Sequence, residues 1–135
     1  MAFEKEMQLL VRAEKEGNPI GPISDRFSKE LSLEDAHTIC EGNIGNRMKA
    51  GEKLVGYKIG FTNIPVRQKL GWPDSMYGYL MDSMLLDSGA QVTVSDLITP
   101  KIECEICFRI GENLSGKDLS VETVLAATET GSASF

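Results

Sequence analysis

The feature that most constrains the fold is the apolar, β-branched segment from Lys101 to Ile110, which reads KIECEICFRI. β-Branched and aromatic residues favour strands, and side chains along a strand alternate between its two faces. A strand here puts Glu103, Glu105 and Cys107 on one face. The sequence therefore predicts an amphipathic strand with two acidic residues on its polar face. Its opposite face carries Ile102, Cys104, Ile106 and Phe108.

The two glutamates of this strand lie close enough to act together. Their Cβ atoms are expected roughly 6.5 to 7 Å apart, because two rises separate alternate residues of a strand. Two carboxylates at that spacing repel each other and resist loss of water, so a positive group between Glu103 and Glu105 would stabilise them. A hard divalent cation is one candidate, since Mg²⁺ binds carboxylate oxygens. An edge strand with a wet polar face is the alternative, and the spacing alone leaves both open.

A second candidate strand, from Leu54 to Thr62, carries a lysine between glycines. Alternation puts Lys58 on the same face as Gly56 and Gly60, opposite an apolar and aromatic face. Glycine allows another group to approach the backbone closely, so this face suits a ligand cleft. Exposure of Lys58 to solvent explains the same pattern and is favoured by spacing alone.

The remaining elements follow from apolar periodicity and from capping and turn residues. Ser32 and the acid three residues later, Asp35, are typical of a helix start. His37, the only histidine, lies inside that helix, where only acids accompany it at helical spacing, so we exclude it from the site. Helices are expected over residues 2–16, 33–50 and 65–70 and after Ser120, strands over Leu80–Leu86 and Ala90–Val94, and a turn able to cover a pocket over Trp72–Gly78.

Composition limits the compartment and the partners. The 135 residues fit one domain, and 14 Lys and Arg against 20 Asp and Glu give a net charge of -6. That charge argues against a binder of nucleic acid or of membrane surfaces, which needs clustered positive charge. No leader pattern and no apolar run of about 20 residues occurs, so we expect a cytoplasmic protein without a membrane partner. The three cysteines favour reduced thiols, and we expect no redox or zinc site at Cys104 and Cys107.

Several segments, taken in order, resemble one known family. They are Gly56–Thr62, Leu70–Gly71 leading to Tyr77–Leu80 with Asp82, Pro100–Phe108, and Leu114–Gly116. Together they resemble the hydratase/decarboxylase branch of the fumarylacetoacetate hydrolase superfamily. Members of that branch include hydratases of 2-oxopent-4-enoate and decarboxylases of 4-oxalocrotonate, which act in the meta-cleavage degradation of aromatic compounds. The likeness extends from the first predicted helix to the end of the sequence.

The resemblance implies a fold and a metal site. The fold is α+β, with N-terminal helices followed by a mixed, rolled β-sheet, here truncated. Residues 1–135 would be a single domain and the N-terminal part of a larger catalytic domain, with 1–53 as a helical lead-in and 54–135 as the start of the β-roll core. Such enzymes hold Mg²⁺ or Mn²⁺ with three carboxylates. Glu103 and Glu105 match the first two, and the third is expected beyond Phe135.

The resemblance also implies an activity on a small 2-oxo acid, a 2-oxo-4-enoate or a 2-hydroxydienoate. Lys58 matches the active-site lysine of these enzymes and would stabilise an anionic oxygen or carry a proton. Hydratases of this branch carry an Asp before the Tyr-Gly pair, whereas Met76 precedes Tyr77 here, so decarboxylation is narrowly favoured. Asp74 could replace that acid, which keeps hydration of 2-oxopent-4-enoate open. The candidate substrate-pocket residues are Asp74, Met76 and Tyr77.

Two other functions stay open from the sequence. An acylpyruvate hydrolase would need a water-activating group that this chain does not obviously supply. A non-catalytic fragment or partner-binding module would fit a chain that matches only part of its relatives. The resemblance also implies a homo-oligomer or a complex between hydratase and decarboxylase subunits.

Overall fold

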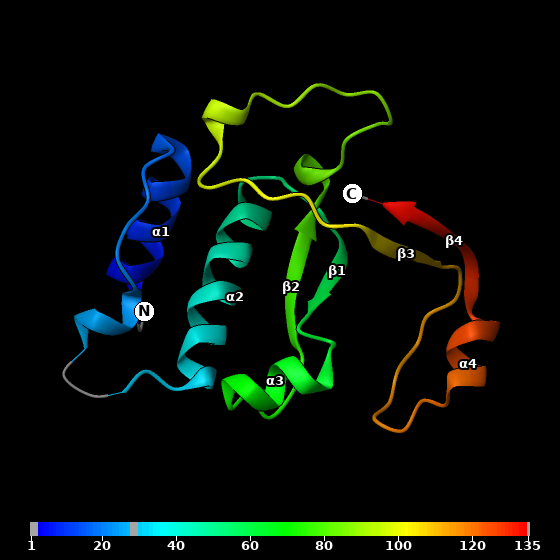
Figure 1. Cartoon of the computed structure of the whole chain (residues 1–135). Helices are drawn as coiled ribbons and strands as arrows, with labels where there is room; N and C mark the ends of the chain where they lie inside the picture. The colour runs from blue at the N-terminus through cyan, green and yellow to red at the C-terminus, as the bar shows by residue number, and fades with distance from the viewer. Residues whose placement is uncertain (1–2, 28–29, 135) are drawn as a thin grey trace. The chain divides into compact units, whose positions relative to one another are not determined.

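The computed structural model describes residues 3–27 and 30–134 (Figure 1). The described chain forms two compact units, one ending at Ile98 and the other starting at Thr99. Each unit contains one two-stranded antiparallel sheet and helices, which confirms the α+β class, and the described residues form no closed barrel. No helix described is long and apolar enough to cross a membrane. The first unit has α1 (Glu4–Glu16), α2 (Leu33–Lys49), β1 (Leu54–Gly60), α3 (Ile64–Leu70) and β2 (Met76–Met81), the second has β3 (Glu105–Ile110), α4 (Val121–Ala126) and β4 (Thr128–Ser134), and short 3₁₀ helices cover Ile23–Arg26, Asp82–Met84 and Val94–Asp96.

Local side-chain chemistry fixes the helix ends. The Ser32 hydroxyl accepts a hydrogen bond from the Asp35 backbone N–H at 3.1 Å, and the Asp35 carboxylate accepts one from the Ser32 backbone N–H at 3.1 Å. This is the capping box that the sequence predicts for α2. Asn63 and Ser120 cap α3 and α4 in the same way, each accepting from the backbone three residues later. Helix α1 ends at Gly17, whose φ of 62° glycine adopts at little cost.

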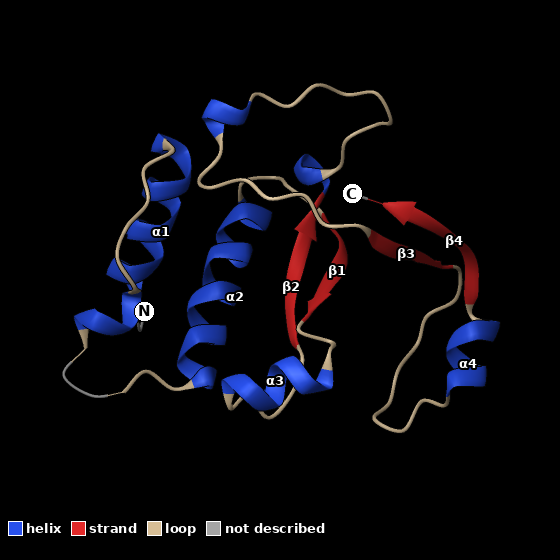
Figure 2. Cartoon of the chain, in the orientation of Figure 1, coloured by secondary structure: helices blue, strands red, loops and turns tan. Residues whose placement is uncertain are grey.

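The sheet of the first unit is a β1–β2 pair that packs beside α2. In the antiparallel register Lys58 lies opposite Gly78, and Ile59 lies opposite Tyr77. Helix α2 runs alongside β2 in Figure 2, and the ring of His37 stacks on Tyr77 with centroids 4.8 Å apart. Helix α2 therefore contacts β2, the strand paired with the one that carries Lys58.

The sheet of the second unit is amphipathic. Strands β3 and β4 pair with Ile106 opposite Ala133 and Phe108 opposite Gly131. Directly paired residues share a face, so these two pairs form an apolar face. Glu105 lies on the other face, and this alternation agrees with the prediction from the sequence.

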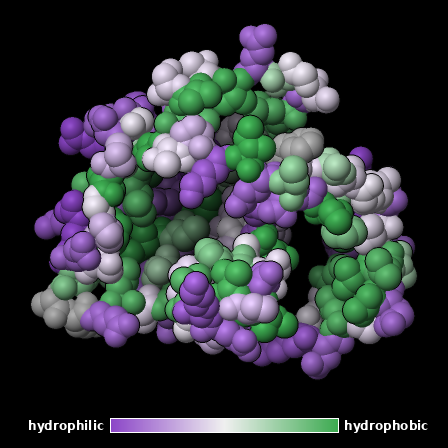
Figure 3. All heavy atoms as spheres, in the orientation of Figure 1, coloured by the Kyte–Doolittle hydropathy of each residue, from purple (hydrophilic) through white to green (hydrophobic). Residues whose placement is uncertain are grey.

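The buried core of the described residues is small. Many large apolar side chains are exposed, and in Figure 3 the hydrophobic atoms, drawn green, reach the surface among hydrophilic ones. Burial of apolar surface is the main favourable contribution to folding, so a chain with few buried side chains depends strongly on its polar contacts. The fully or nearly buried hydrophobic residues are Met7, Ala13, Ile39, Met81 and Ala127.

An ion-pair network ties the helices of the first unit to its hairpin. Arg47 on α2 donates to the carboxylate of Glu52 at 3.0 Å from Nε and 2.8 Å from Nη2. Its Nη2 also donates to the Ser83 hydroxyl at 3.1 Å, and its Nη1 lies 3.4 Å from Glu14 on α1. The Ser83 hydroxyl in turn donates to Glu52. One guanidinium group therefore joins α1, α2 and the segments that flank the hairpin.

The strand predicted over Leu80–Leu86 is wrong in its bounds. Strand β2 ends before Asp82, whose carboxylate accepts the Lys53 backbone N–H at 3.0 Å and whose own N–H donates to the Lys53 carbonyl. The chain then turns into a 3₁₀ helix. Strand β2 begins inside the predicted turn, because Met76 finds a pairing partner in Gly60.

Three other elements differ from the sequence prediction. Residues Ala90–Val94 form no strand and lead into a 3₁₀ helix, since no described strand pairs with them. The strand predicted from Lys101 starts only at Glu105, where pairing with β4 begins. Strand β4 itself was not predicted, because its small and polar residues form a strand only when β3 offers a partner.

Replacing Arg47 with methionine should lower the free energy of unfolding by roughly 1 to 2 kcal/mol, because several charge-assisted hydrogen bonds are lost while the aliphatic volume is kept. The hydrogen bond from Arg47, then that from Ser83, lowers the pKa of Glu52 below its ordinary 4.5. A lowered folded-state pKa stabilises the fold above pH 4.5 and loses this effect as pH falls through the folded value. Urea titration at several pH values should show the Arg47→Met penalty shrinking below that pH.

The matched control for that prediction is Arg12→Met. Arg12 pairs with Glu16 at 2.8 Å on the exposed surface of α1. Exposed pairs contribute little, so its loss should change stability by less than about 0.5 kcal/mol. Equal penalties for the two arginine variants would contradict a special role for the Arg47 network.

Candidate functional site

Lys58 lies on a face of the hairpin that glycine residues border on three sides. Its cross-strand neighbour is Gly78, and Gly56 and Gly60 are its neighbours along β1. A Cβ atom added at Gly60 or at Gly78 would meet no other heavy atom within 4 Å. Gly60 and Gly78 therefore leave space on this face, whereas a Cβ at Gly56 would meet the Leu80 side chain at 3.8 Å.

The structure separates the predicted pocket residues. Met76 lies opposite Gly60 and so shares the face of Lys58. Tyr77 lies opposite Ile59 on the other face, toward α2. Of these two neighbours in sequence, only Met76 is brought to the lysine side of the hairpin.

Asp74, the third predicted pocket residue, belongs to the connection between β1 and β2. Its carboxylate accepts a hydrogen bond from Arg67 at 3.2 Å and from the Ser75 backbone at 2.7 Å. Arg67 is largely buried and also donates to the Ser75 hydroxyl at 3.0 Å. At the start of the connection, Phe61 has a φ of 56° and packs edge-on against Trp72 at 4.3 Å. Hydrogen bonds near the end of the connection and a ring contact between its start and Trp72 thus hold it in place.

The face toward α2 holds an aromatic cluster that the sequence interpretation did not include. The Tyr79 hydroxyl donates to the Glu41 carboxylate at 3.0 Å, and the rings of Tyr77 and Tyr79 lie 5.9 Å apart. Burial, followed by the hydrogen bond to Glu41, raises the pKa of Tyr79, so its phenol stays protonated. His37 and Glu41 are four residues apart on α2, a spacing that could have indicated a shared helix face.

The two predicted metal ligands lie in the second unit. Glu105 is the first residue of β3, and Glu103 lies two residues earlier in an irregular segment. Both side chains are exposed. Two carboxylates are the donor type that a hard divalent cation prefers. Within residues 3–27 and 30–134, however, no group of three or more His, Cys, Asp or Glu residues could hold a metal ion. Glu103 and Glu105 thus have the donor type that such an ion prefers, and among the described residues no third His, Cys, Asp or Glu joins them in such a group.

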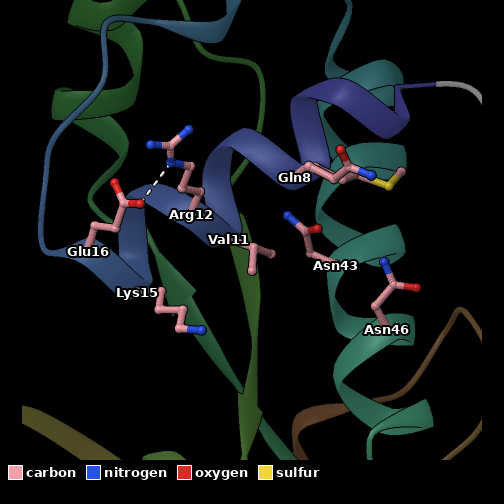
Figure 4. Close-up of a pocket in the computed structure, with 8 residues that line it drawn as sticks. Gln8, Val11, Arg12, Lys15, Glu16, Asn43 and Asn46 are labelled. Atoms are coloured by element: carbon pink, nitrogen blue, oxygen red, sulfur yellow. Dashed lines mark hydrogen bonds and ion pairs between the residues drawn. The ribbon is translucent and has the colours of Figure 1, made fainter.

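Another hollow lies between α1 and α2, apart from every predicted site residue. It measures about 560 Å³, and Figure 4 shows Val11, Arg12 and Asn43 among the residues that line it. Arg12 is paired there with Glu16, and the side-chain oxygen of Asn43 is buried without a hydrogen-bond partner. Its open shape and mixed lining do not indicate a reaction centre.

Comparison with known proteins finds relatives that are hydratases and a decarboxylase. No family model matches the sequence. The chain is 34% identical over 128 residues to the TodF product hydratase of Pseudomonas putida, covering 95% of the chain and 47% of the relative. It is also 34% identical over 126 residues to the 2-keto-4-pentenoate hydratase of Paraburkholderia xenovorans, covering 93% and 46%. The chain thus spans about half the length of the curated relatives that it matches.

Solved structures show the same pattern. The 4-oxalocrotonate decarboxylase of Pseudomonas putida G7, complexed with magnesium and adipate, aligns with a TM-score of 0.83 at 30% identity, covering 93% of this chain and 47% of that chain. The same decarboxylase complexed with calcium and acetate aligns with a TM-score of 0.86 at 28% identity, covering 93% and 48%. Those structures carry a divalent metal, magnesium in one and calcium in the other.

Gly78→Ala should leave the hairpin intact, because its Cβ would enter open space and Gly78 has no positive φ. Alanine in a strand is favoured over glycine, so the free energy of unfolding should stay equal or rise by up to about 1 kcal/mol. Gly17→Ala is the contrasting variant, because a φ of 62° strains alanine and should cost about 1 kcal/mol. Thermal unfolding followed by circular dichroism measures both; marked destabilisation by Gly78→Ala would contradict an open lysine face.

Proposed function

Because the chain belongs to the hydratase and decarboxylase branch of the fumarylacetoacetate hydrolase superfamily, we propose that it is part of a divalent-metal-dependent lyase. The substrate class is 2-oxo-4-enoate or 2-hydroxydienoate acids from meta-cleavage of aromatic compounds. The observation that carries the proposal is Lys58 on an open, glycine-lined face of the hairpin, in a chain similar to such enzymes along most of its length. Activity belongs to the complete catalytic domain, of which this chain supplies about half.

Lys58 is the residue proposed to act on substrate. A lysine ammonium group is a compact positive charge with three donors, so it suits an oxygen that becomes negative during the reaction. As a neutral amine, a lysine could also exchange a proton with the substrate carbon chain. The open positions at Gly60 and Gly78 leave room for that chain next to the Lys58 stem.

Glu103 and Glu105 are the proposed metal ligands, with the third carboxylate beyond Phe135. The magnesium and calcium of the solved decarboxylase structures support a divalent ion, and we propose Mg²⁺ or Mn²⁺. When bound, such an ion polarises the oxygens of a 2-oxo acid and neutralises negative charge. Two carboxylates alone should bind it weakly, because Mg²⁺ requires a nearly octahedral site.

Decarboxylation is favoured over hydration, on the identity of one neighbour of Lys58. Met76 shares the lysine face and has no acid or base group, so at that position nothing moves a proton to or from water. Asp74 is proposed as a pocket residue, but its carboxylate is already engaged by Arg67 and Ser75. Tyr77 would reach the pocket only from the face toward α2. Hydration of 2-oxopent-4-enoate and acylpyruvate hydrolysis are the other reactions to test, and the proposed compartment is the cytoplasm.

A non-catalytic, partner-binding role is the second candidate function, favoured by the apolar face of the β3–β4 sheet. Ile106, Phe108 and Ile110 are 70%, 56% and 45% exposed on that face. Exposed apolar clusters on a strand pair invite association, since burying them is favourable. The proposed occupant is a second copy of this chain, with a related hydratase or decarboxylase subunit as the alternative.

Metal titration tests the proposed ligands. Calorimetry with Mn²⁺, and then with Mn²⁺ plus pyruvate as a small 2-oxo acid, should show weak binding to the unaltered chain. Glu103→Gln combined with Glu105→Gln should abolish that heat, because neutral amides bind hard cations poorly. The control is Glu112→Gln combined with Asp118→Asn, two acids of the same unit with no assigned role. If the binding heat remains in the Glu103→Gln, Glu105→Gln variant, or disappears in the control variant, Glu103 and Glu105 are not the metal ligands.

Sedimentation velocity over a range of protein concentrations tests the partner-binding face. The unaltered chain should associate, and Ile106→Ser combined with Phe108→Ser should shift it to monomer, because the buried apolar area is lost. Cys107→Ser is the matched control, since it changes a residue on the polar face of the same strand. A hetero-complex would instead appear only when a related subunit is added. If the Ile106→Ser, Phe108→Ser variant associates as the unaltered chain does, this face is not the interface.

A further inference from the structure

Two side chains of α2, neither of them a proposed site residue, contact two tyrosines of β2. His37 stacks on Tyr77 with ring centroids 4.8 Å apart and an angle of 21° between the rings. Glu41 accepts the hydroxyl hydrogen bond of Tyr79 at 3.0 Å. The helix residues are four apart and the strand residues two apart, so each pair lies on one face of its own element. The contact is therefore a matched two-point attachment between helix and strand.

This attachment selects which face of β2 turns toward α2. Along β2, Met76, Gly78 and Leu80 alternate with tyrosines and Met81, so a slip of one residue would turn the opposite set toward the helix. The apolar pattern alone distinguishes these two arrangements poorly, because methionines occur in both sets. Of the two sets, only the tyrosines offer a ring that can stack on His37 and a hydroxyl that can donate to Glu41. That choice leaves Gly78, and with it Lys58 across the strand pair, on the face away from α2.

The contacts between α2 and β2 are polar, although apolar side chains alone could pack a helix against a strand. Tyr77 is 46% exposed, so its stack with His37 buries little apolar area. A hydrogen bond to a carboxylate depends on direction and distance far more than an apolar contact does. Burial and Glu41 raise the pKa of Tyr79, so the phenol remains a donor. These contacts fix the position of β2 relative to α2 and bury little apolar area.

We propose that His37 and Glu41 are positioning residues, which hold β2 through Tyr77 and Tyr79 so that Lys58 is presented on the opposite face of the hairpin. The functional meaning of this inference rests on the proposed role of Lys58. Neither residue touches the proposed substrate, and both act through the strand pair.

The test follows Lys58 directly by NMR on the full chain with ¹³Cε-labelled lysine. The Lys58 signal is assigned by its absence in Lys58→Arg. Its position is measured alone and during titration with Mg²⁺ and pyruvate. Glu41→Ala and His37→Ala should move the signal by more than its width. They should also raise the apparent dissociation constant for pyruvate about tenfold, as expected when displacement of the Lys58 ammonium group removes its hydrogen bond to the pyruvate carboxylate.

Conservative variants separate positioning from general stability. Glu41→Gln keeps an acceptor oxygen and His37→Phe keeps a stacking ring, so both should retain the Lys58 signal of the unaltered chain. Tyr79→Phe removes only the hydroxyl and should change the Lys58 signal as Glu41→Ala does. The double variant Glu41→Ala with Tyr79→Phe should shift that signal no further than either single variant. Glu34→Ala, an exposed acid in the first turn of α2, is the control and should leave Lys58 unchanged.

The outcomes distinguish the inference from the function it rests on. A Lys58 signal that stays in place in Tyr79→Phe and in the folded alanine variants overturns the positioning role. If the alanine variants do not fold, the Tyr79→Phe result alone decides, because that variant keeps the ring in place. If the unaltered chain shows no response of Lys58 to Mg²⁺ and pyruvate, the proposed function fails, while the signals of the variants still decide whether His37 and Glu41 position the lysine.

Discussion

The antiparallel register between β1 and β2 is the constraint on which the proposed chemistry depends. It sets Lys58 opposite Gly78, a position without a side chain, where an added Cβ would meet no heavy atom within 4 Å. The same register sends Tyr77 to the opposite face, where His37 stacks on it. Side-chain alternation couples the two faces, so whatever fixes one also fixes the other. The contacts with α2 and the open lysine face are consequences of one pairing.

Polar contacts contribute an unusually large share of the organisation of the first unit. Few of its apolar side chains are buried, whereas Arg47 alone connects two helices with the segments before β1 and after β2. Directional hydrogen bonds specify one arrangement even where burial is modest. Exposed apolar side chains such as those of Ile106 and Phe108 gain stability only when something covers them. This agrees with a chain that spans about half the length of its relatives.

The residues proposed for catalysis and for metal binding come from different units of the chain. Lys58 belongs to the first unit, and Glu103 and Glu105 belong to the second. The described residues supply two carboxylates of a proposed set of three, so the metal site is incomplete within them. The proposed roles of the lysine and the two acids are chemically consistent, because an ammonium group and a hard cation both stabilise negative oxygen. Met76 beside Lys58 then bears on which reaction follows.

The sequence by itself determined the local features. The capping box at Ser32, the first helix up to residue 16 and the alternation along β3 depend only on nearby residues, and all were predicted. Tertiary structure decided the rest. Strand β4, the end of β2 at Asp82 and the attachment of Tyr79 to Glu41 each need a partner distant in the chain. Strand bounds and side-chain partners could not be predicted, because the free energy of strand pairing depends on the residues of both segments. The pattern of one segment does not show which other segment will pair with it.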